Sequence, residues 1–236
     1  MNTEVVGYKT MSSAISEATG YTKWICDAIR PYVGSRVLEV GTGNANYREY
    51  LPNIQRFFSV DIDSHVIADA KKKDAAGEYH VADLSSHDFM TSFAARDFDT
   101  VYCLNVLEHI EADRLALKNM SNLLKERGHL IGFVPAFSEL YSKMDELAGH
   151  HRRYTKKDIR QHADALGLKI ELCEYFNPIG GVGWWVNKFF GHQSLDSNAI
   201  NQQILFFDRY VLPISKLLNP LTKAWFGQSL LFVLRR

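Results

Sequence analysis

The stretch VLEVGTGNAN, residues 37–46, decides the fold of this chain. It begins as an aliphatic run around one acidic residue, Glu39, and then turns through Gly41 and Gly43. A buried parallel strand that ends in a glycine turn lets the backbone bend sharply and approach a ligand closely. The stretch therefore predicts a strand followed by a turn that holds a nucleotide-type cofactor.

Two residues of this stretch bear on which cofactor is held. The dinucleotide fingerprint GxGxxG has a third glycine, which packs the following helix close to the strand, but Asn46 occupies that position here. Glu39 lies at the carboxyl end of the strand, where a carboxylate would repel a pyrophosphate and attract a cationic group. The pattern therefore disfavours a nicotinamide dinucleotide and favours a cofactor that carries an ammonium and a sulfonium group.

A second carboxylate, Asp61, follows Gly41 by twenty residues, at the end of the next apolar run. This is the spacing at which a carboxylate on the second strand of a βαβ unit accepts hydrogen bonds from a ribose diol. The alternative is that Asp61 only caps the helix that follows.

The composition limits the classes of partner and compartment. Lys plus Arg and Asp plus Glu both number 27, so no net charge favours nucleic acid or an anionic membrane. The three cysteines, Cys26, Cys103 and Cys173, have neither disulfide-framework nor zinc-site spacing, which fits a reducing cytosol. With 46% hydrophobic residues in 236 and no apolar run long enough to span a membrane, we expect one soluble cytoplasmic α/β domain.

Hydrophobic periodicity predicts strands that alternate with helices. This order calls for a doubly wound, mostly parallel sheet with right-handed crossovers. We predict helices over residues 13–29, 46–51, 65–73, 113–124 and 155–166, strands over 36–40, 55–60, 79–82, 100–104, 129–134, 168–173 and 229–234, and about fifty mostly helical, aromatic-rich residues before the last strand.

The run VLEVGTGNA resembles the first motif of class I S-adenosylmethionine-dependent methyltransferases, with Ala45 in place of its last glycine. The segment NVLEHI, residues 105–110, agrees with this resemblance. The family fold is a Rossmann-like seven-stranded sheet with an antiparallel last strand. The resemblance implies a single domain: an N-terminal helical lid over residues 1–30, a cofactor-binding core over 31–176, a helical acceptor-side insertion over 177–226 and the last strand over 227–236.

The resemblance also implies which residues hold S-adenosylmethionine. Asp61 would meet the ribose, Asp83 and Leu84 the adenine, and Asn105 the amino acid end of the cofactor. For Asp83 a plain turn aspartate is the alternative. The predicted cofactor-binding residues are Glu39, Gly41, Thr42, Gly43, Asp61, Ile62, Asp83, Leu84, Asn105 and Val106.

Two histidines are candidate catalytic bases. His109 follows the fourth strand on the ligand edge of the sheet, and His150 belongs to the run GHHRRYT, residues 149–155. For His109 the alternative is that Glu108 and His109 only orient the loop. A base is needed only if the acceptor keeps its proton, because the sulfonium already activates the methyl group.

The run GHHRRYT resembles the GHxRRYT motif of a bacterial methyltransferase subgroup, and its donors suit an anionic or polar group, although a solvated basic turn is the alternative. The apolar segment 176–190 beside it fits a pocket wall, a homodimer surface, a peripheral membrane contact or plain core packing. We therefore expect a small amphipathic or anionic acceptor in biosynthesis and no metal. The predicted substrate-binding residues are Tyr21, His151, Arg152, Arg153, Tyr154 and Trp184.

Two other classes of function are weighed against this enzyme. A non-catalytic partner subunit would keep the fold and use the aromatic insertion as an interface. A nucleic-acid methyltransferase is disfavoured because the charge is balanced and NVLE, not an NPPY-like motif, follows the fourth strand.

Overall fold

A computed structural model describes residues 12–86, 89, 93, 97–189 and 196–236. The predicted N-terminal lid therefore lies partly outside the described residues. Residues 190–195 of the predicted insertion also lie outside them. None of the helices in the described ranges combines the length and hydropathy that crossing a bilayer requires.

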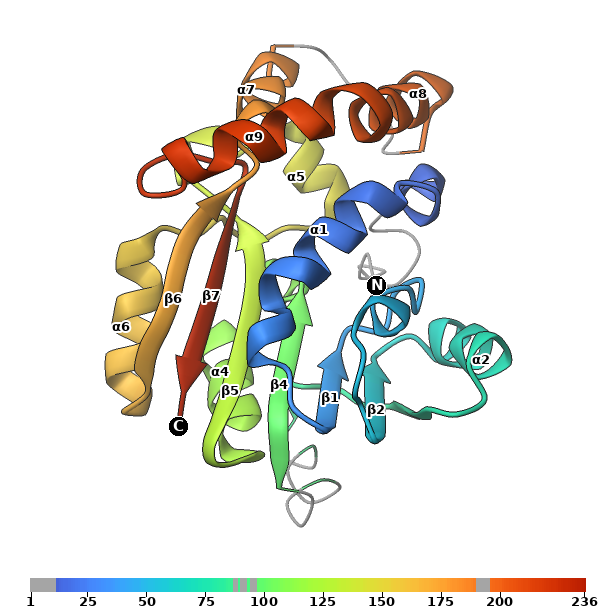
Figure 1. The fold of residues 1–236 in the computed structure, drawn as a ribbon, viewed down its shortest axis with the longest axis vertical. Helices are drawn as coiled ribbons and strands as arrows, with labels where there is room; N and C mark the ends of the chain where they lie inside the picture. Colours follow the sequence, from blue (N-terminus) through green and yellow to red (C-terminus); the bar gives the residue numbers. More distant parts are fainter. Residues whose placement is uncertain (1–11, 87–88, 90–92, 94–96, 190–195) are drawn as a thin grey trace.

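A seven-stranded sheet forms the centre of the molecule, in the order β3-β2-β1-β4-β5-β7-β6 (Figure 1). All neighbouring pairs from β3 to β5 are parallel, while β7 runs antiparallel to both β5 and β6. The predicted doubly wound sheet with an antiparallel last strand is therefore confirmed. The strands are β1 Arg36–Val40, β2 Arg56–Asp61, β3 Glu78–Val81, β4 Phe98–Leu104, β5 Leu124–Pro135, β6 Lys169–Phe176 and β7 Ser229–Arg235.

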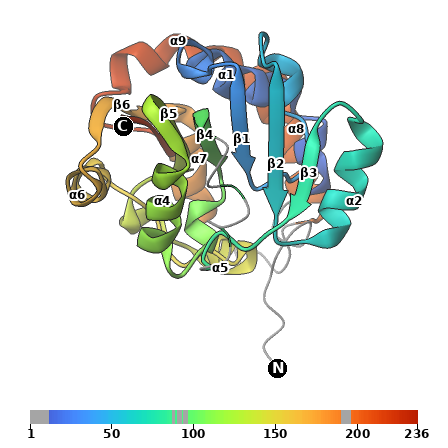
Figure 2. The same ribbon diagram turned by 90° about the horizontal axis from the view of Figure 1, so that it is seen from below.

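Helices cover both faces of this sheet and gather beyond the carboxyl ends of its parallel strands (Figures 1 and 2). Side chains of α1 and α2 pack against one face, and side chains of α4 and α6 pack against the other. The α-helices of the described residues are α1 Thr19–Ile29, α2 Ser64–Lys73, α4 Asp113–Asn122, α5 Lys143–Ala148, α6 Lys156–Leu166, α7 Pro178–Asn187, α8 Asn198–Phe206 and α9 Leu212–Thr222, with a π-helical segment at Phe207–Val211.

Alternate residues of the central strands enter the two cores. In β4, Val101 and Cys103 belong to the core beneath α4 and α6, whereas Tyr102 and Leu104 belong to the core beneath α1 and α2. A strand buried on both faces reads as a continuous apolar run, which is why the sequence TVYCL shows no polar alternation. The sheet is thus rigidly packed at the point where its strands end and the loops begin.

Several element boundaries differ from the sequence predictions. The helix expected over residues 46–51 is only a 3₁₀ turn at Arg48–Tyr50, because Pro52 and the positive φ of Asn53 follow at once. The helix expected over residues 13–29 is divided into a 3₁₀ turn, Ser13–Ser16, and α1. Strand β5 begins at Leu124 rather than at His129, since Leu124 already pairs with Phe98 before an irregularity in the register.

The insertion between β6 and β7 leaves and rejoins the sheet at one point. Asn177 follows β6 with a φ of +61°, and its side-chain amide donates to Gln228 Oε1 over 2.7 Å. The backbone amide of Gln228 donates in turn to the carbonyl of Asn177 over 3.0 Å. These hydrogen bonds join the two ends of the helical insertion, α7 to α9, directly at the sheet. We call this pair of residues the closed neck of the insertion.

Candidate active site

A cleft of about 920 Å³ opens at the carboxyl ends of β1, β2, β3 and β4. In open α/β sheets this edge is where ligands bind, because the loops after the strands diverge there. Elements far apart in sequence form its walls: the loops after these strands on one side, and residues of α5, α7 and α8 on the other. The cleft thus joins the predicted cofactor residues to the predicted acceptor-side insertion.

The glycine turn after β1 has no room for a side chain. Gly41 has a φ of +82°, and a Cβ there would lie 2.1 Å from Cγ2 of Val106. Asn105, at the end of β4, also has a positive φ of 55°, a conformation that Asn tolerates better than most residues. Gly41, Gly43, Asn105 and Val106 all line the cleft, so these two turns present backbone and small side chains to a ligand.

Asp61 lines the same cleft at the end of β2. Its carboxylate accepts from the backbone amide of Asp63 over 2.9 Å and from that of Gly43 over 3.3 Å. Burial raises the pKa of Asp61, against the effect of these amides. The next residue, Ile62, lines the cleft with 47% of its surface exposed, as an apolar face for a flat ring.

Asp83 and Leu84 also line the cleft, in the loop after β3. Asp83 Oδ1 accepts from the amide and the hydroxyl of Ser85, over 2.8 and 2.6 Å. One carboxylate oxygen is therefore used for the turn, as the alternative interpretation of Asp83 expects. The carboxylate as a whole still lies at the cleft wall.

Glu39 and Thr42 lie beneath the cleft and do not line it. Glu39 is 1% exposed, and its two oxygens accept from Ser59 Oγ over 2.6 Å and from Tyr102 Oη over 2.9 Å. Thr42 Oγ1 lies 2.7 Å from the same Ser59 Oγ. Burial raises the pKa of Glu39 to about 7. In this structure Glu39 is thus bonded inside the core rather than aimed at a ligand.

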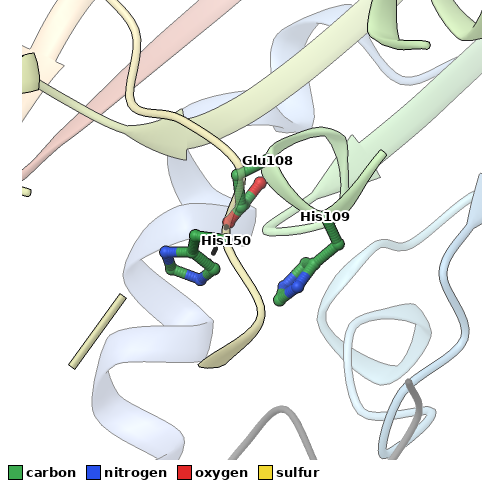
Figure 3. A group of neighbouring side chains, drawn as sticks. All are labelled: Glu108, His109 and His150. Carbon is green, nitrogen blue, oxygen red and sulfur yellow. Dashed lines mark ion pairs between the residues drawn. The ribbon is translucent and has the colours of Figure 1, made fainter. Parts of the chain in front are cut away.

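Glu108 and His109, in the loop after β4, form a cluster with His150, in the loop after α5 (Figure 3). All three residues line the cleft. Their potential metal-ligand atoms all lie within 4.8 Å of one another, and the two imidazole rings are 4.8 Å apart. Burial raises the pKa of Glu108 to about 7. Burial, and next the charge of His150, lower the pKa of His109 to about 3, so the imidazole of His109 is neutral.

Asp145 in α5 positions both His150 and Arg153. Its Oδ1 accepts from His150 Nδ1 and from Arg153 Nε, each over 2.8 Å, and its side chain is fully buried. Although burial alone would raise the pKa of Asp145, these two partners hold it below its usual value. Two side chains of the GHHRRYT run thus point inward to the same carboxylate.

Two more of the predicted residues of that run, Arg152 and Tyr154, form a second group at Asp113. Arg152 forms an ion pair with Asp113 over 2.7 Å, and the buried Tyr154 hydroxyl donates to the same carboxylate over 3.0 Å. Neither lines the cleft, whereas His150, His151 and Arg153 do. The two arginines point in different directions, as expected for adjacent residues.

Trp184 in α7 lines the cleft, and the guanidinium of Arg153 lies 4.8 Å above its ring. Its indole Nε1 is buried and has no hydrogen-bond partner among the residues that the structure describes. Tyr21 does not line the cleft; it packs edge-on against Phe133 and Phe176, and burial raises its pKa to about 12.

Sequence reasoning missed several residues of this site. Asp145 is the most important of them, because only the fold brings a residue of α5 against His150; its sequence context, a capping box with Ser142, indicates no more than the start of a helix. For Glu108 the sequence predicts only a role in orienting its loop. The lining residues that the sequence does not predict include several on the acceptor side and in the N-terminal turn, namely Ser12, Ile15, Met144, Ala148, Ile200 and Ile204.

Comparison with known proteins agrees with this geometry. Residues 38–132 match the profile of a family described as a methyltransferase domain. The matched segment runs from β1 to β5 and holds most of the predicted cofactor residues. This segment of the chain is therefore similar to a methyltransferase domain. No curated protein sequence matches the chain.

Solved structures share the fold of the methyltransferase domain over nearly the whole chain. An S-adenosylmethionine-dependent methyltransferase from Mesorhizobium loti is 18% identical, with a TM-score of 0.64 over 93% of this chain and 100% of that one. A chain from the complex of the Haloferax volcanii Trm112 methyltransferase activator is 14% identical, with a TM-score of 0.62 over 94% and 90%. The [4+2]-cyclase SpnF is also 14% identical, with a TM-score of 0.62 over 91% and 80%. At these identities the likeness establishes the fold.

The residues of the methyltransferase domain fit its cofactor, S-adenosylmethionine. A Cβ at Gly41 would collide with Val106, so the turn leaves room for a ligand only as glycine. The cleft wall has the carboxylate of Asp61, the exposed apolar side chain of Ile62 and the backbone around Asn105, which would suit a ribose, an adenine and the amino acid end of the cofactor, respectively. When bound, the cofactor supplies an electrophilic methyl group.

Proposed function

We propose that this protein transfers a methyl group from S-adenosylmethionine to a small amphipathic acceptor. The observation that carries the proposal is the single cleft, which joins Gly41 and Asp61 on the cofactor side to His150 and Trp184 on the other. A donor and an acceptor bound there would meet without leaving the site, and in-line alignment is the main requirement of methyl transfer. The division into lid, cofactor-binding core and acceptor-side insertion is part of this proposal.

The chemistry of the far wall supports an acceptor with an apolar body and a polar head. Met144, Ile200 and Ile204 supply apolar surface. The unpartnered indole Nε1 of Trp184 is a hydrogen-bond donor, and an acceptor oxygen would satisfy it. The charge of Arg153 is already balanced by Asp145, which favours a polar head over a strongly anionic one.

A second candidate function is that of a partner subunit with the methyltransferase fold. It is favoured by the similarity to a chain from the complex of the Trm112 methyltransferase activator, and by exposed apolar side chains on α9 such as Leu217, which is 76% exposed. Cofactor binding followed by turnover would exclude this candidate, whereas cofactor-independent association with a second protein would favour it.

Calorimetry with S-adenosylmethionine and its demethylated product tests the proposed function. We expect saturable binding of one molecule per chain, weakened about 10- to 100-fold in Asp61→Asn, because hydrogen bonds to a charged group contribute about 1.5 to 3 kcal/mol. Asp63→Asn is the matched control: Asp63 caps α2 outside the cleft, and Asn is an equally good cap. Folded wild-type protein that binds neither ligand would contradict the proposal.

A further inference from the structure

The cluster of Glu108, His109 and His150 contains buried polar atoms that lack partners. Glu108 is 1% exposed, and neither its Oε2 nor Nδ1 of His109 has a hydrogen bond within the described part of the chain. Buried polar groups are nearly always satisfied, so each such atom needs an explanation. An unsatisfied carboxylate oxygen and an unsatisfied ring nitrogen in one cluster, whose potential ligand atoms lie within 4.8 Å of one another, indicate a missing electropositive partner.

His150 is held so that its second nitrogen is also available. Asp145 Oδ1 lies 2.8 Å from His150 Nδ1, and because a carboxylate only accepts, Nδ1 carries the proton. In the neutral form of His150 the lone pair is therefore on Nε2, which lies 4.0 Å from Glu108 Oε1, too far for a hydrogen bond. A carboxylate bonded to the far nitrogen of a histidine is the arrangement that orients histidine ligands in metal sites.

The local charge also favours a cation. Two carboxylates, Glu108 and Asp145, face one guanidinium, that of Arg153. When Glu108 is ionised, one negative charge is left over in a largely buried environment, where electrostatic attraction is stronger than in water. A bound cation would balance it.

We propose that Glu108, His109 and His150 bind a first-row divalent transition-metal ion, through one carboxylate oxygen and two imidazole nitrogens. Two histidines and one carboxylate form a set typical of zinc and iron sites that keep an open coordination position, whereas calcium and magnesium prefer oxygen ligands throughout. The three potential ligand atoms lie within 4.8 Å of one another. Bound ligands would be about 3 Å apart at metal–ligand distances of about 2.1 Å, so side-chain rotations have to draw them together.

The open position of this metal faces the cleft, because all three ligand residues line it together with Gly41 and Asp61. An oxygen of the acceptor would fill that position. This inference about the acceptor rests on the proposed function. It limits the acceptor to molecules that offer an oxygen ligand, such as a hydroxyl, beside an apolar body. A metal ion would lower the pKa of such a hydroxyl and so favour its methylation.

Titration of metal-free protein with Co²⁺ tests the site, since its visible absorption reports the ligands. We expect one Co²⁺ per chain, displaced by Zn²⁺, and binding at least 10-fold weaker in Glu108→Gln, His109→Ala and His150→Ala. His151→Ala is the matched control, because His151 is the adjacent histidine on the same wall but outside the cluster. No saturable binding, or equal binding by wild type and His150→Ala, would overturn the proposal.

Two further measurements do not depend on the variants folding. Electron paramagnetic resonance of Cu²⁺ bound to the wild type should show coupling to imidazole nitrogens, and its absence would overturn the site. Acetohydroxamate, a bidentate oxygen ligand, should shift the Co²⁺ absorption if a position is open; an unchanged spectrum would overturn the open position. Metal titration without cofactor and cofactor calorimetry on metal-free protein can fail separately, so the two proposals are distinguishable.

Discussion

Replacing Glu39 by glutamine should remove a pH dependence from the stability of this protein. Glu39 lies near the carboxyl end of β1, buried between the hydroxyls of Ser59 and Tyr102. Burial raises its pKa from 4.5 to about 7. Glutamine has nearly the same shape and does not titrate, so the variant isolates the ionisation of this one carboxyl group.

The sign of the effect follows from proton binding. Between pH 4.5 and about 7 the unfolded chain has lost the Glu39 proton and the native protein keeps it, so the free energy of unfolding falls as pH rises through this window. A full shift of this size corresponds to about 3 kcal/mol at 1.36 kcal/mol per pKa unit. From pH 5 to pH 8, Glu39→Gln should gain about 2 to 3 kcal/mol relative to the wild type.

Urea unfolding at several pH values between 5 and 8, with linear extrapolation to water, measures this difference. Any constant cost of placing an amide between Ser59 and Tyr102 cancels when the two ends of the pH range are compared. Glu126→Gln, at an exposed position of β5, serves as the control. A wild-type-to-variant difference that stays constant within about 0.5 kcal/mol from pH 5 to pH 8 would refute the reasoning.

Two further substitutions test the turn after β1 and the start of β4. Gly41→Ala should lower the free energy of unfolding by about 1 to 3 kcal/mol and should weaken cofactor binding in calorimetry, because the new Cβ would meet Val106. Gly183→Ala is the control: Gly183 lies in α7 with open space around it, so this substitution should be neutral or stabilising by up to about 1 kcal/mol. Although burial alone would raise the pKa of Asp99, hydrogen bonds including that from the amide of Arg36 lower it to about 2. Asp99→Asn should therefore destabilise the protein by about 1 to 3 kcal/mol in urea unfolding at pH 7, and the difference should shrink as pH falls from 3.8 toward 2.

Local sequence patterns predicted most of the sheet and the helix ends that carry a cap. Strand β1 has the predicted bounds, and α6 lies between its predicted Thr155 cap and Gly167. The helix predicted over residues 46–51 was wrong, because apolar spacing over six residues does not outweigh Pro52 immediately after them. Patterns of short range are thus reliable where a cap or a long apolar run supports them.

The site was predicted less completely, because its contacts depend on how its loops and helices pack together and not on local patterns. Residues that follow strands, such as Asp61 and Asn105, line the cleft as expected, since carboxyl ends of parallel strands meet at one edge. Nothing in the sequence indicated that Asp145 would hold His150, or that the adjacent Arg152 would turn to Asp113 instead. Such pairings depend on how α5 and its loop pack against α4, which the local pattern does not encode.

The insertion leaves and rejoins the sheet at the closed neck between Asn177 and Gln228. The acceptor half of the cleft can therefore change in sequence and length independently of the cofactor half. A chain excursion that begins and ends at the same place can be lengthened, shortened or exchanged at small entropic cost, since closing a longer loop adds only about 0.6 kcal/mol per doubling. The strands that hold the cofactor would keep their register through such an exchange. Grafting insertions from other members of this fold onto the same neck is therefore a practical route to new acceptors, with the cofactor half left untouched.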